Sequence, residues 1–321
     1  MSRFQELLRA SMKSKDTEEW LDVHFTRPVG LVFALMWKRL GVHPNAVTIL
    51  SIFLGAGAAY CFYFTDLCHN LCGVMLLILA NLCDSTDGQL ARLTHQHTFI
   101  GRMLDGFASQ LWFLGIYVAI AMRLQHQPMP FTDIHWGLGS WALAAVAGIL
   151  CHSQQSSLSD YYRQIHLYFL KGKEGSELDH SKQQYDIYKS LAKNEWLKKL
   201  FYANYANYCC GQERRTPAFQ RFFQCYLKHP HEDVKQRFVA GSRPLMPYAN
   251  ILTFNTRAIC LYVTCLLNCP WVYFVFEIVV LHTLYIYMHN RHENLCKRLT
   301  SDLEKLPNTF NHGDEYGKKY I

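Results

Sequence analysis

The stretch DSTDGQLARLTHQHTFIGRMLDGFAS, residues 84–109, places charged side chains between two long apolar runs. Its acidic and basic residues are Asp84, Asp87, Arg92, Arg102 and Asp105. Insertion scales assign an aspartate at the middle of a membrane helix a cost of about 2.5–3.5 kcal/mol. Several carboxylates in such a setting therefore indicate a functional site.

The apolar runs around this stretch predict an all-α integral membrane protein. Hydrophobic residues make up 50% of the 321 residues. They gather in runs long enough, at about 1.5 Å of helix per residue, to cross about 30 Å of hydrocarbon. We expect six membrane-spanning helices, near residues 46–65, 68–90, 100–122, 137–158, 249–268 and 270–290. The charged stretch then lies on the second and third of them.

The remaining segments are arranged around these expected spans. Residues 29–37 form an apolar run too short to cross a bilayer, which predicts an amphipathic helix at the membrane interface. Residues 171–245 are rich in Lys, Tyr and Gln and predict a helical insertion between the fourth and fifth spans. The expected domains are an N-terminal juxtamembrane region 1–44, spans one to four in 45–170, the insertion 171–245, spans five and six in 246–292, and a tail 293–321.

The distribution of basic residues predicts the orientation. Residues 171–247 contain 14 Lys and Arg, and the first 40 residues contain a further seven. With six spans these segments share one side of the membrane, which the positive-inside rule makes the cytoplasm. Both termini and the charged stretch are then cytoplasmic, in a multi-pass protein of a bacterial inner membrane or the endoplasmic reticulum. The net charge of +7 thus indicates topology and contact with anionic membrane lipids, not nucleic-acid binding.

Helical spacing places the motif residues on two faces. On the first helix, residues at i, i+3, i+4 and i+7 share one face: Asp84, Asp87, Gly88 and Ala91. On the next helix, residues four apart share another: Gly101, Asp105 and Ser109. A short turn joins the helices, so the three carboxylates can meet at the cytoplasmic end of the bundle.

A divalent metal ion best accounts for this cluster. Ligands that are all oxygen atoms suit Mg²⁺, Mn²⁺ or Ca²⁺. The small residues Gly88, Ala91 and Gly101 leave room for a ligand to approach the backbone. Carboxylates that hold a metal ion beside such a groove are suited to diphosphate chemistry. Ion pairing of the aspartates with the two arginines is the simpler alternative.

The pattern D-x-x-D-G-x-x-A-R-x8-G-x3-D resembles the signature of the CDP-alcohol phosphotransferase (CDP-alcohol phosphatidyltransferase) family of membrane lipid synthases. It is carried by Asp84, Asp87, Gly88, Ala91, Arg92, Gly101 and Asp105. The resemblance implies two divalent ions, Mg²⁺ or Mn²⁺, with Asp84, Asp87 and Asp105 as ligands. It also implies that Gly88, Ala91, Arg92 and Gly101 line the site for the CDP group.

The sequence departs from the family pattern at Ser109, where the family has a fourth aspartate. The resemblance makes that aspartate a metal ligand and the general base. A serine neither accepts a proton at neutral pH nor supplies a carboxylate, so the second metal ion is held more weakly. Three explanations stay open. Another base such as His95 or His97 replaces it, the chain is an inactivated copy, or it binds nucleotide without turnover.

The resemblance implies transfer of a phosphoalcohol group from a CDP-linked donor, such as CDP-diacylglycerol, to an acceptor alcohol, with release of CMP. A phosphatidylinositol-type product is the favoured expectation among phospholipids and sphingolipids. Arg257, at the start of the fifth span, is a candidate ligand for an anionic substrate group or an arginine reaching lipid headgroups.

Two rival functions come from other classes. One is a family member that binds CDP-lipid without catalysis, which rests on Ser109. The other is a cation-handling membrane protein, which ranks last because the first, fifth and sixth spans contain few polar residues besides Glu277. Small residues on the helix faces would permit a homodimer.

Overall fold

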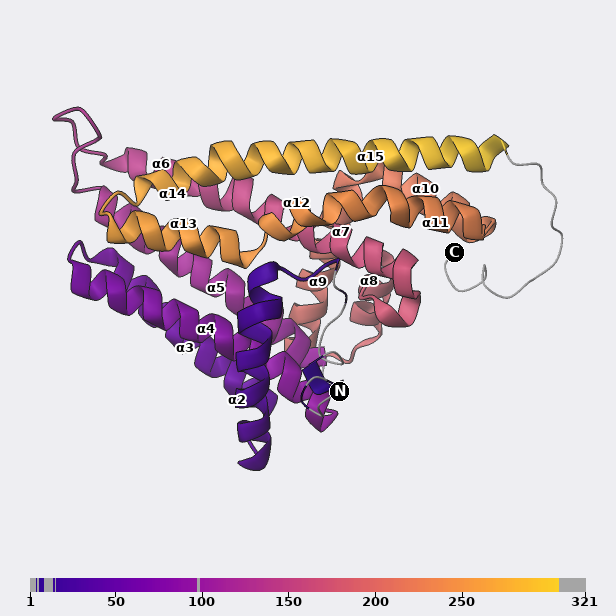
Figure 1. Cartoon of the computed structure of the whole chain (residues 1–321), viewed down its shortest axis with the longest axis horizontal. Coiled ribbons are helices and arrows are strands. Elements are labelled where there is room, and N and C mark those ends of the chain that lie inside the picture. Colours follow the sequence, from indigo (N-terminus) through magenta and orange to yellow (C-terminus); the bar gives the residue numbers. More distant parts are fainter. Residues whose placement is uncertain (1–3, 5, 9–13, 15, 97–98, 306–321) are drawn as a thin grey trace. The chain divides into compact units, whose positions relative to one another are not determined.

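A computed structural model describes residues 4, 6–8, 14, 16–96 and 99–305, without the side chains of residues 99, 100, 102, 103 and 105. In this part of the chain the regular structure is helical (Figure 1). A lone antiparallel bridge pairs Pro128 with His135. The prediction of an all-α fold is therefore confirmed.

The chain forms two compact units, and each is built from two separate pieces of sequence. Unit 1 combines Met1–Ser156 with Ile251–Thr283. Unit 2 combines Ser157–Asn250 with Leu284–Ile321. The motif lies in unit 1, and the whole of the polar segment 171–245 lies in unit 2.

The helices of each unit follow in chain order, with η marking short 3-10 or π-helical segments. Unit 1 contains η1 (Asp22–Thr26), α2 (Arg27–Arg39), α3 (Pro44–Tyr63), α4 (Leu67–Thr94), α5 (Phe99–Leu124), α6 (Leu138–Ala145), η2 (Val146–His152), α13 (Phe254–Leu266), α14 (Trp271–Val275) and η5 (Phe276–Leu281). Unit 2 contains most of α7 (Ser153–Lys171), then η3 (Lys173–Gly175), α8 (Ser181–Ser190), α9 (Trp196–Arg215), α10 (Pro217–Lys228), α11 (Glu232–Ser242), η4 (Arg243–Leu245), α12 (Met246–Ile251, ending at the boundary) and α15 (His282–Lys305, starting at it).

Glycines let α3 pack closely against both α4 and α5. A Cβ atom added at Gly55 of α3 would lie 2.1 Å from the Trp112 ring of α5. One added at Gly73 of α4 would lie 3.0 Å from the Phe62 ring of α3. Small residues at such contacts allow membrane helices to approach closely, as dispersion and packing require. The rings of Phe62 and Trp112 are consequently buried in the core of unit 1.

Local sequence sets where the motif-bearing helices begin. Pro44 occupies the first turn of α3, where a backbone N–H would have no acceptor within the helix. The His43 ring accepts a hydrogen bond from the Asn45 amide at 3.2 Å. Asp66 caps α4 by accepting a hydrogen bond from the His69 amide at 3.0 Å. These caps fix the helix starts.

Four helices of the described chain are long and apolar enough to cross a membrane. They are Pro44–Tyr63, Leu67–Thr94, Gly106–Leu124 and Trp271–Lys305. They correspond to the first, second, third and sixth of the expected spans. The count of six is not confirmed.

The fourth and fifth expected spans fall short for different reasons. Helix α13 has 13 residues. At about 1.5 Å per residue it is roughly 20 Å long, less than the hydrocarbon thickness. The run from α6 into α7 is long enough, but it changes from apolar residues to the polar segment HSQQSS at 152–157. The apolar window there is consequently shorter than a span requires.

Helix α2 covers the predicted interfacial segment and has two unlike faces. Leu31 and Ala34 are fully buried, whereas Val32 and Met36 are 57% and 44% exposed. Exposed apolar side chains on a helix too short to span suit the interface of a bilayer. The helix is thus present, and its location at a membrane interface stays a prediction.

A buried arginine joins three segments of unit 1 at the end of α5. Arg123 donates hydrogen bonds to the Phe62 carbonyl at 3.0 Å, to Asn70 Oδ1 at 2.9 Å and to Asn268 Oδ1 at 2.7 Å. The side chain is only 3% exposed. Neutral oxygen atoms accept hydrogen bonds from both terminal nitrogens of the guanidinium, so the side chain joins α3, α4 and the turn after α13.

Unit 2 has an aromatic core. Helix α10 presents Phe219, Phe222 and Phe223 on one buried face. The ring of Phe238 from α11 lies 4.2 Å from that of Phe169 in α7 and 5.3 Å from that of Phe222. Aromatic burial of this extent stabilises a packed helical unit. The segment predicted to be a helical insertion is therefore helical and folded.

Candidate functional site

The acidic motif lies in the last turns of α4. Asp84 and Asp87 are three residues apart and share a face of the helix. Asp87 is 3% exposed and Asp84 is half-buried. Two like charges on one helix face repel each other, and burial increases the repulsion. Their placement thus favours a bound cation.

A threonine of α3 contacts the buried carboxylate. The Thr48 hydroxyl donates a hydrogen bond to Asp87 Oδ2, and the Pro44 carbonyl lies 3.3 Å from the same hydroxyl. Thr48 is 2% exposed, so this contact is shielded from solvent. A hydrogen bond to a charged acceptor is among the stronger ones in proteins. Thr48 therefore orients Asp87 from the neighbouring helix.

Helix α2 packs against the same part of α4. A Cβ atom added at Gly30 would lie 2.9 Å from Gln89 Nε2, which donates a hydrogen bond to the Arg27 carbonyl at 3.2 Å. Farther along, Lys38 Nζ donates to the Leu93 carbonyl at 2.8 Å. The end of α4 is therefore held by the N-terminal helix as well as by α3.

The small motif residues have the expected room around them. A Cβ atom added at Gly88 would first meet the Arg92 guanidinium, at 3.7 Å. Arg92 lies four residues later, so its side chain extends back over Gly88 on the same face. Ala91 lies between these two residues in the sequence and is half-buried. A guanidinium beside a glycine suits binding of a phosphate group.

The other half of the motif is only partly described. Gly101 and Ser109 lie on α5 and are half-buried, and the backbone of Asp105 is helical between them. The Asp105 side chain lies outside the described residues, as does all of His97. His95 follows α4 in the left-handed conformation, with φ 55°, and is exposed. It ends the helix, a role that suits a residue after the last turn.

The structure shows Arg257 in a buried ion pair. Its guanidinium, 1% exposed, donates hydrogen bonds to Glu277, to Gln155 Oε1 at 2.9 Å and to the Leu252 carbonyl at 2.9 Å. Glu277 is fully buried, and its other oxygen lies 3.8 Å from His152 Nδ1. These contacts join α13, η5 and α7.

Sequence reasoning did not find Thr48, Gln89 or the pairing of Arg257 with Glu277. The last of these carried a usable signal, because a single acid and a single base in two neighbouring apolar helices need each other. Thr48 carried no signal beyond its position near the start of α3.

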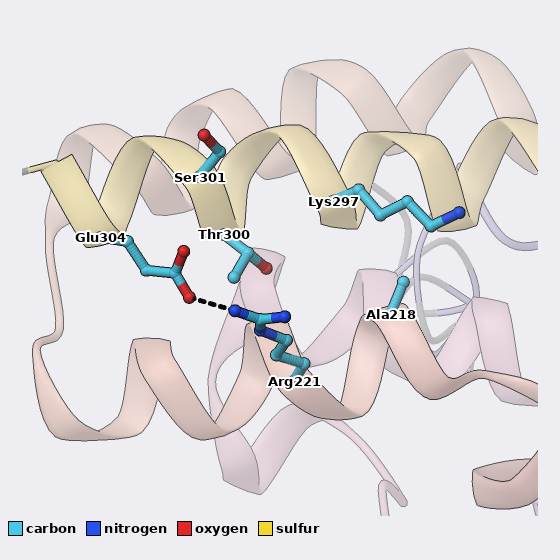
Figure 2. Close-up of a pocket in the computed structure, with 6 residues that line it drawn as sticks. All are labelled: Ala218, Arg221, Lys297, Thr300, Ser301 and Glu304. Carbon is cyan, nitrogen blue, oxygen red and sulfur yellow. Dashed lines mark hydrogen bonds and ion pairs between the residues drawn. The ribbon is translucent and has the colours of Figure 1, made fainter.

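Two further clusters in unit 2 have structural explanations. Figure 2 shows a surface hollow between α10 and α15, where Arg221 pairs with Glu304 at 2.7 Å. Both side chains are well exposed, at 70% and 48%. An exposed pair of this kind contributes about 0–1 kcal/mol. The hollow is lined by Ala218, Arg221, Lys297, Thr300, Ser301 and Glu304.

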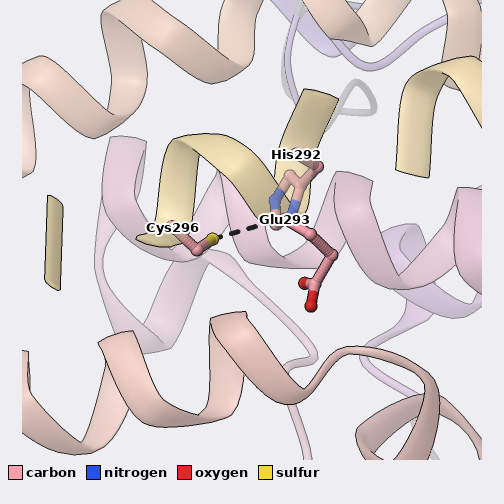
Figure 3. Close-up of side chains that lie close together, drawn as sticks. All are labelled: His292, Glu293 and Cys296. Carbon is pink, nitrogen blue, oxygen red and sulfur yellow. Dashed lines mark hydrogen bonds between the residues drawn. The ribbon is translucent and has the colours of Figure 1, made fainter. Parts of the chain in front are cut away.

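The second cluster is buried on α15 and is shown in Figure 3. His292, Glu293 and Cys296 place one ligand-type atom each within 4.8 Å of one another. The Glu293 carboxylate, however, accepts hydrogen bonds from the backbone amides of Ala218 at 2.8 Å and Phe219 at 3.3 Å. Those amides belong to the first turn of α10, so Glu293 satisfies a helix N-terminus. Glu293, the acid of the cluster, therefore acts first as a helix cap.

The fold and the motif together define a class. Helices long and apolar enough for a bilayer, one of which ends in paired aspartates, describe an integral membrane protein with a carboxylate site. Comparison with protein families gives a match to one part of the chain. Residues 41–160 match the model of the family described as CDP-alcohol phosphatidyltransferase. The matched segment contains the whole motif, and the resemblance seen in the sequence is confirmed over it. A comparison with curated proteins gives no match.

Proposed function

We propose that the protein transfers a phosphoalcohol group from a CDP-linked donor to an acceptor hydroxyl and releases CMP. The observation that carries this proposal is the pair Asp84 and Asp87 on one face of α4, within the segment that matches the family. Among the lipid products that such a transfer can give, we favour a phosphatidylinositol-type product.

The residues of the motif fit a divalent cation. Carboxylate oxygens are the ligands that Mg²⁺ and Mn²⁺ prefer, and the Thr48 contact fixes one of the two described carboxylates. Asp84, Asp87 and Asp105 would hold the ions, with the second held weakly because of Ser109. When bound, such ions would supply positive charge that stabilises the leaving CMP.

The chain's own residues then have defined roles. Gly88, Ala91 and Gly101 let the CDP group approach the helices, and Arg92 binds phosphate oxygens. The acceptor oxygen forms a bond to the β-phosphorus, the bond from that phosphorus to the bridging oxygen breaks, and CMP leaves with its electron pair. The acceptor's proton passes to a base. Ser109 occupies the position of the expected base, and the imidazole of His95, or of His97, is the alternative that we propose.

A second candidate function rests on Ser109. With a hydroxyl at that position the chain would bind CDP-lipid but release CMP slowly or not at all. Both functions predict binding of the donor, and only the first predicts turnover.

The test is release of CMP from CDP-diacylglycerol by the full chain in detergent, with Mg²⁺ or Mn²⁺ and a panel of alcohols. Ser109→Asp, Asp105→Asn and His95→Ala are assayed beside it. Transfer by the native chain that Asp105→Asn abolishes supports the enzyme. Activity in Ser109→Asp alone supports the binding-only member, and silence from all four with intact donor binding does the same. Silence without donor binding overturns both.

The proposed orientation can be tested with native cysteines. Cys68 lies at the start of α4 and Cys210 lies on α9, and both are exposed. We propose that the motif end of α4 and the segment 171–245, which includes α9, are cytoplasmic. In sealed vesicles with the cytoplasmic face outward, a membrane-impermeant maleimide should then label Cys210, and Cys68 only after permeabilisation. Cys68→Ala and Cys210→Ala identify each signal, and labelling in the reverse order overturns the orientation.

A further inference from the structure

The most unusual surface of unit 2 is the end of the hairpin formed by α8 and α9. Three large apolar side chains lie in the first turn of α9: Trp196 is 68% exposed, Leu197 is 43% exposed and Leu200 is 53% exposed. Tyr185 of α8 is 48% exposed. We call these four residues the hairpin tip.

The rest of the hairpin is anchored and polar. The Glu213 carboxylate accepts hydrogen bonds from the amide of Ser181 at 2.9 Å and from its hydroxyl, which attaches the start of α8 to the end of α9. Gln212 Nε2 donates to the Ser157 carbonyl of α7 at 2.9 Å. Beyond the first turn, the exposed positions of α9 include Asn204 and Asn207. Exposure of large apolar groups on α9 is therefore confined to its first turn.

Basic side chains surround the hairpin tip. Lys189, Lys193 and Lys198 are exposed, and Lys199 is half-buried beside them. The nearby acids are Asp186 and Glu195, and Glu195 pairs with Lys198 at 2.6 Å. Positive charge is therefore in excess around an apolar centre.

We propose that the hairpin tip docks on a bilayer surface that contains anionic lipids. Tryptophan with leucine at one end of a helix and lysines around them is the composition of an interfacial segment. The indole suits the headgroup level, and lysine stems reach from apolar surface to phosphate groups. Charge complementarity selects anionic lipid over a neutral surface. The inference rests on the membrane setting of the proposed function, but not on the transfer reaction.

The experiment measures the fluorescence of Trp196 in the full chain. The chain is reconstituted in bilayers with brominated acyl chains, made either of neutral lipid or with anionic lipid added. Emission of Trp196→Phe is subtracted to isolate Trp196. Strong quenching in the anionic bilayer and weak quenching in the neutral one is the expected result.

A charge variant tests the basis of docking. Exchange of Lys189, Lys193 and Lys198 for Gln should weaken docking about tenfold or more, because each lysine near an anionic surface contributes substantially. The matched control exchanges three exposed cations elsewhere in unit 2 for Gln, and should leave quenching unchanged. These are Arg214, Lys228 and Arg298.

Three results overturn the proposal: no quenching in either bilayer, equal quenching in both, or equal loss in the two triple variants. A different set of results would assign the surface to a second copy of the chain instead. In that case Trp196 is protected from a water-soluble quencher, is not quenched by lipid, and the chain cross-links as a dimer. CMP release is recorded on the same samples, so a failure of catalysis is distinguishable from a failure of docking.

Discussion

Two pairs of charged side chains among the apolar helices of unit 1 differ in whether their charges are opposite or alike. The Arg257 and Glu277 pair joins opposite charges from two helices, and both groups are almost completely buried. The Asp84 and Asp87 pair places like charges on one helix, with Asp84 only half-buried. The first arrangement neutralises itself. We propose that the second gains stability from a bound cation.

This contrast separates a structural role from a ligand-binding role. Besides pairing with Glu277, Arg257 donates hydrogen bonds to Gln155 and to a backbone carbonyl. The hydrogen-bonding capacity of this pair is therefore used within the protein. Paired carboxylates beside Gly88 are placed to gain from a cation that comes with the substrate. Charge within apolar sequence is thus informative only once its partners are known.

The largest expected effect is the loss of activity when one of the paired aspartates is replaced. Asp87→Asn should lower CMP release about 1,000-fold or more, because charge stabilisation of several kcal/mol is lost and each 1.36 kcal/mol is tenfold. Kinetics at saturating donor and Mg²⁺ measure it. Asp66→Asn is the matched control, since asparagine also caps a helix and Asp66 lies at the other end of α4. Equal loss in both variants would contradict the assignment.

Breaking the Arg257 and Glu277 pair should lower the stability of the fold. Arg257→Leu leaves Glu277 buried without its partner and should destabilise the fold by about 3–5 kcal/mol. The double variant Arg257→Leu with Glu277→Leu should recover most of that loss. Unfolding in mixed detergent, analysed as a double-mutant cycle, measures both. A double variant no more stable than the single one would show that Arg257 does more than neutralise Glu277.

A smaller effect on activity is expected from the hydrogen bond that Thr48 donates to Asp87. Thr48→Val removes the hydroxyl donor to Asp87 and keeps the shape of the side chain. We expect activity to fall about tenfold to 100-fold, because a hydrogen bond to a charged group contributes about 1.5–3 kcal/mol. The Mg²⁺ concentration for half-maximal rate should rise as well. Thr48→Ser retains the donor and should stay near native activity, and its failure to do so would point to packing instead.

The smallest effect comes from a carboxylate outside the apolar helices. Burial alone would raise the pKa of Glu213, but hydrogen bonds from His180 and Ser181 outweigh it and lower the pKa below 4.5. A carboxylate with a lowered pKa stabilises the fold above its unfolded pKa and loses that contribution as the pH falls through the folded value.

Comparison with Glu213→Gln measures this contribution. The native chain should be more stable by about 1 kcal/mol at pH 7, a modest figure because solvent still reaches the carboxylate, whose side chain is 19% exposed. The difference should shrink as the pH falls through the lowered pKa of the folded state and vanish once both states are protonated. Thermal unfolding across pH records it. A difference that persists in acid would mean that shape, not charge, accounts for the effect.

The sequence predicted the helical class and the positions of the motif, because both depend on local patterns. Apolar runs identify α3, α4 and α5, and i, i+3 spacing alone places Asp84 and Asp87 on one face. The count of spans could not be obtained in this way. Helix α13 begins at Phe254, and its short length depends on the preceding break after Ile251, which hydropathy does not show.

The partners of the site residues depend on tertiary packing. Thr48 and Asp87 are 39 residues apart in sequence, and Gln89 and Arg27 are 62 apart. Nothing in a single sequence specifies which side chains meet across helices. For Arg257, the sequence permitted a substrate ligand or an arginine at the headgroups, and the structure shows an ion pair inside the bundle.

The junction at Arg123 has a consequence for biosynthesis. Its partner Asn268 comes 145 residues later in the chain. A ribosome adding about 5–20 residues per second needs roughly 7–29 s to make that interval. During this time the guanidinium waits with only the earlier partners, Phe62 and Asn70, while all of the 157–250 segment is made. Nascent chains that stop before Asn268 therefore carry an incompletely bonded arginine, a feature by which quality control can recognise them.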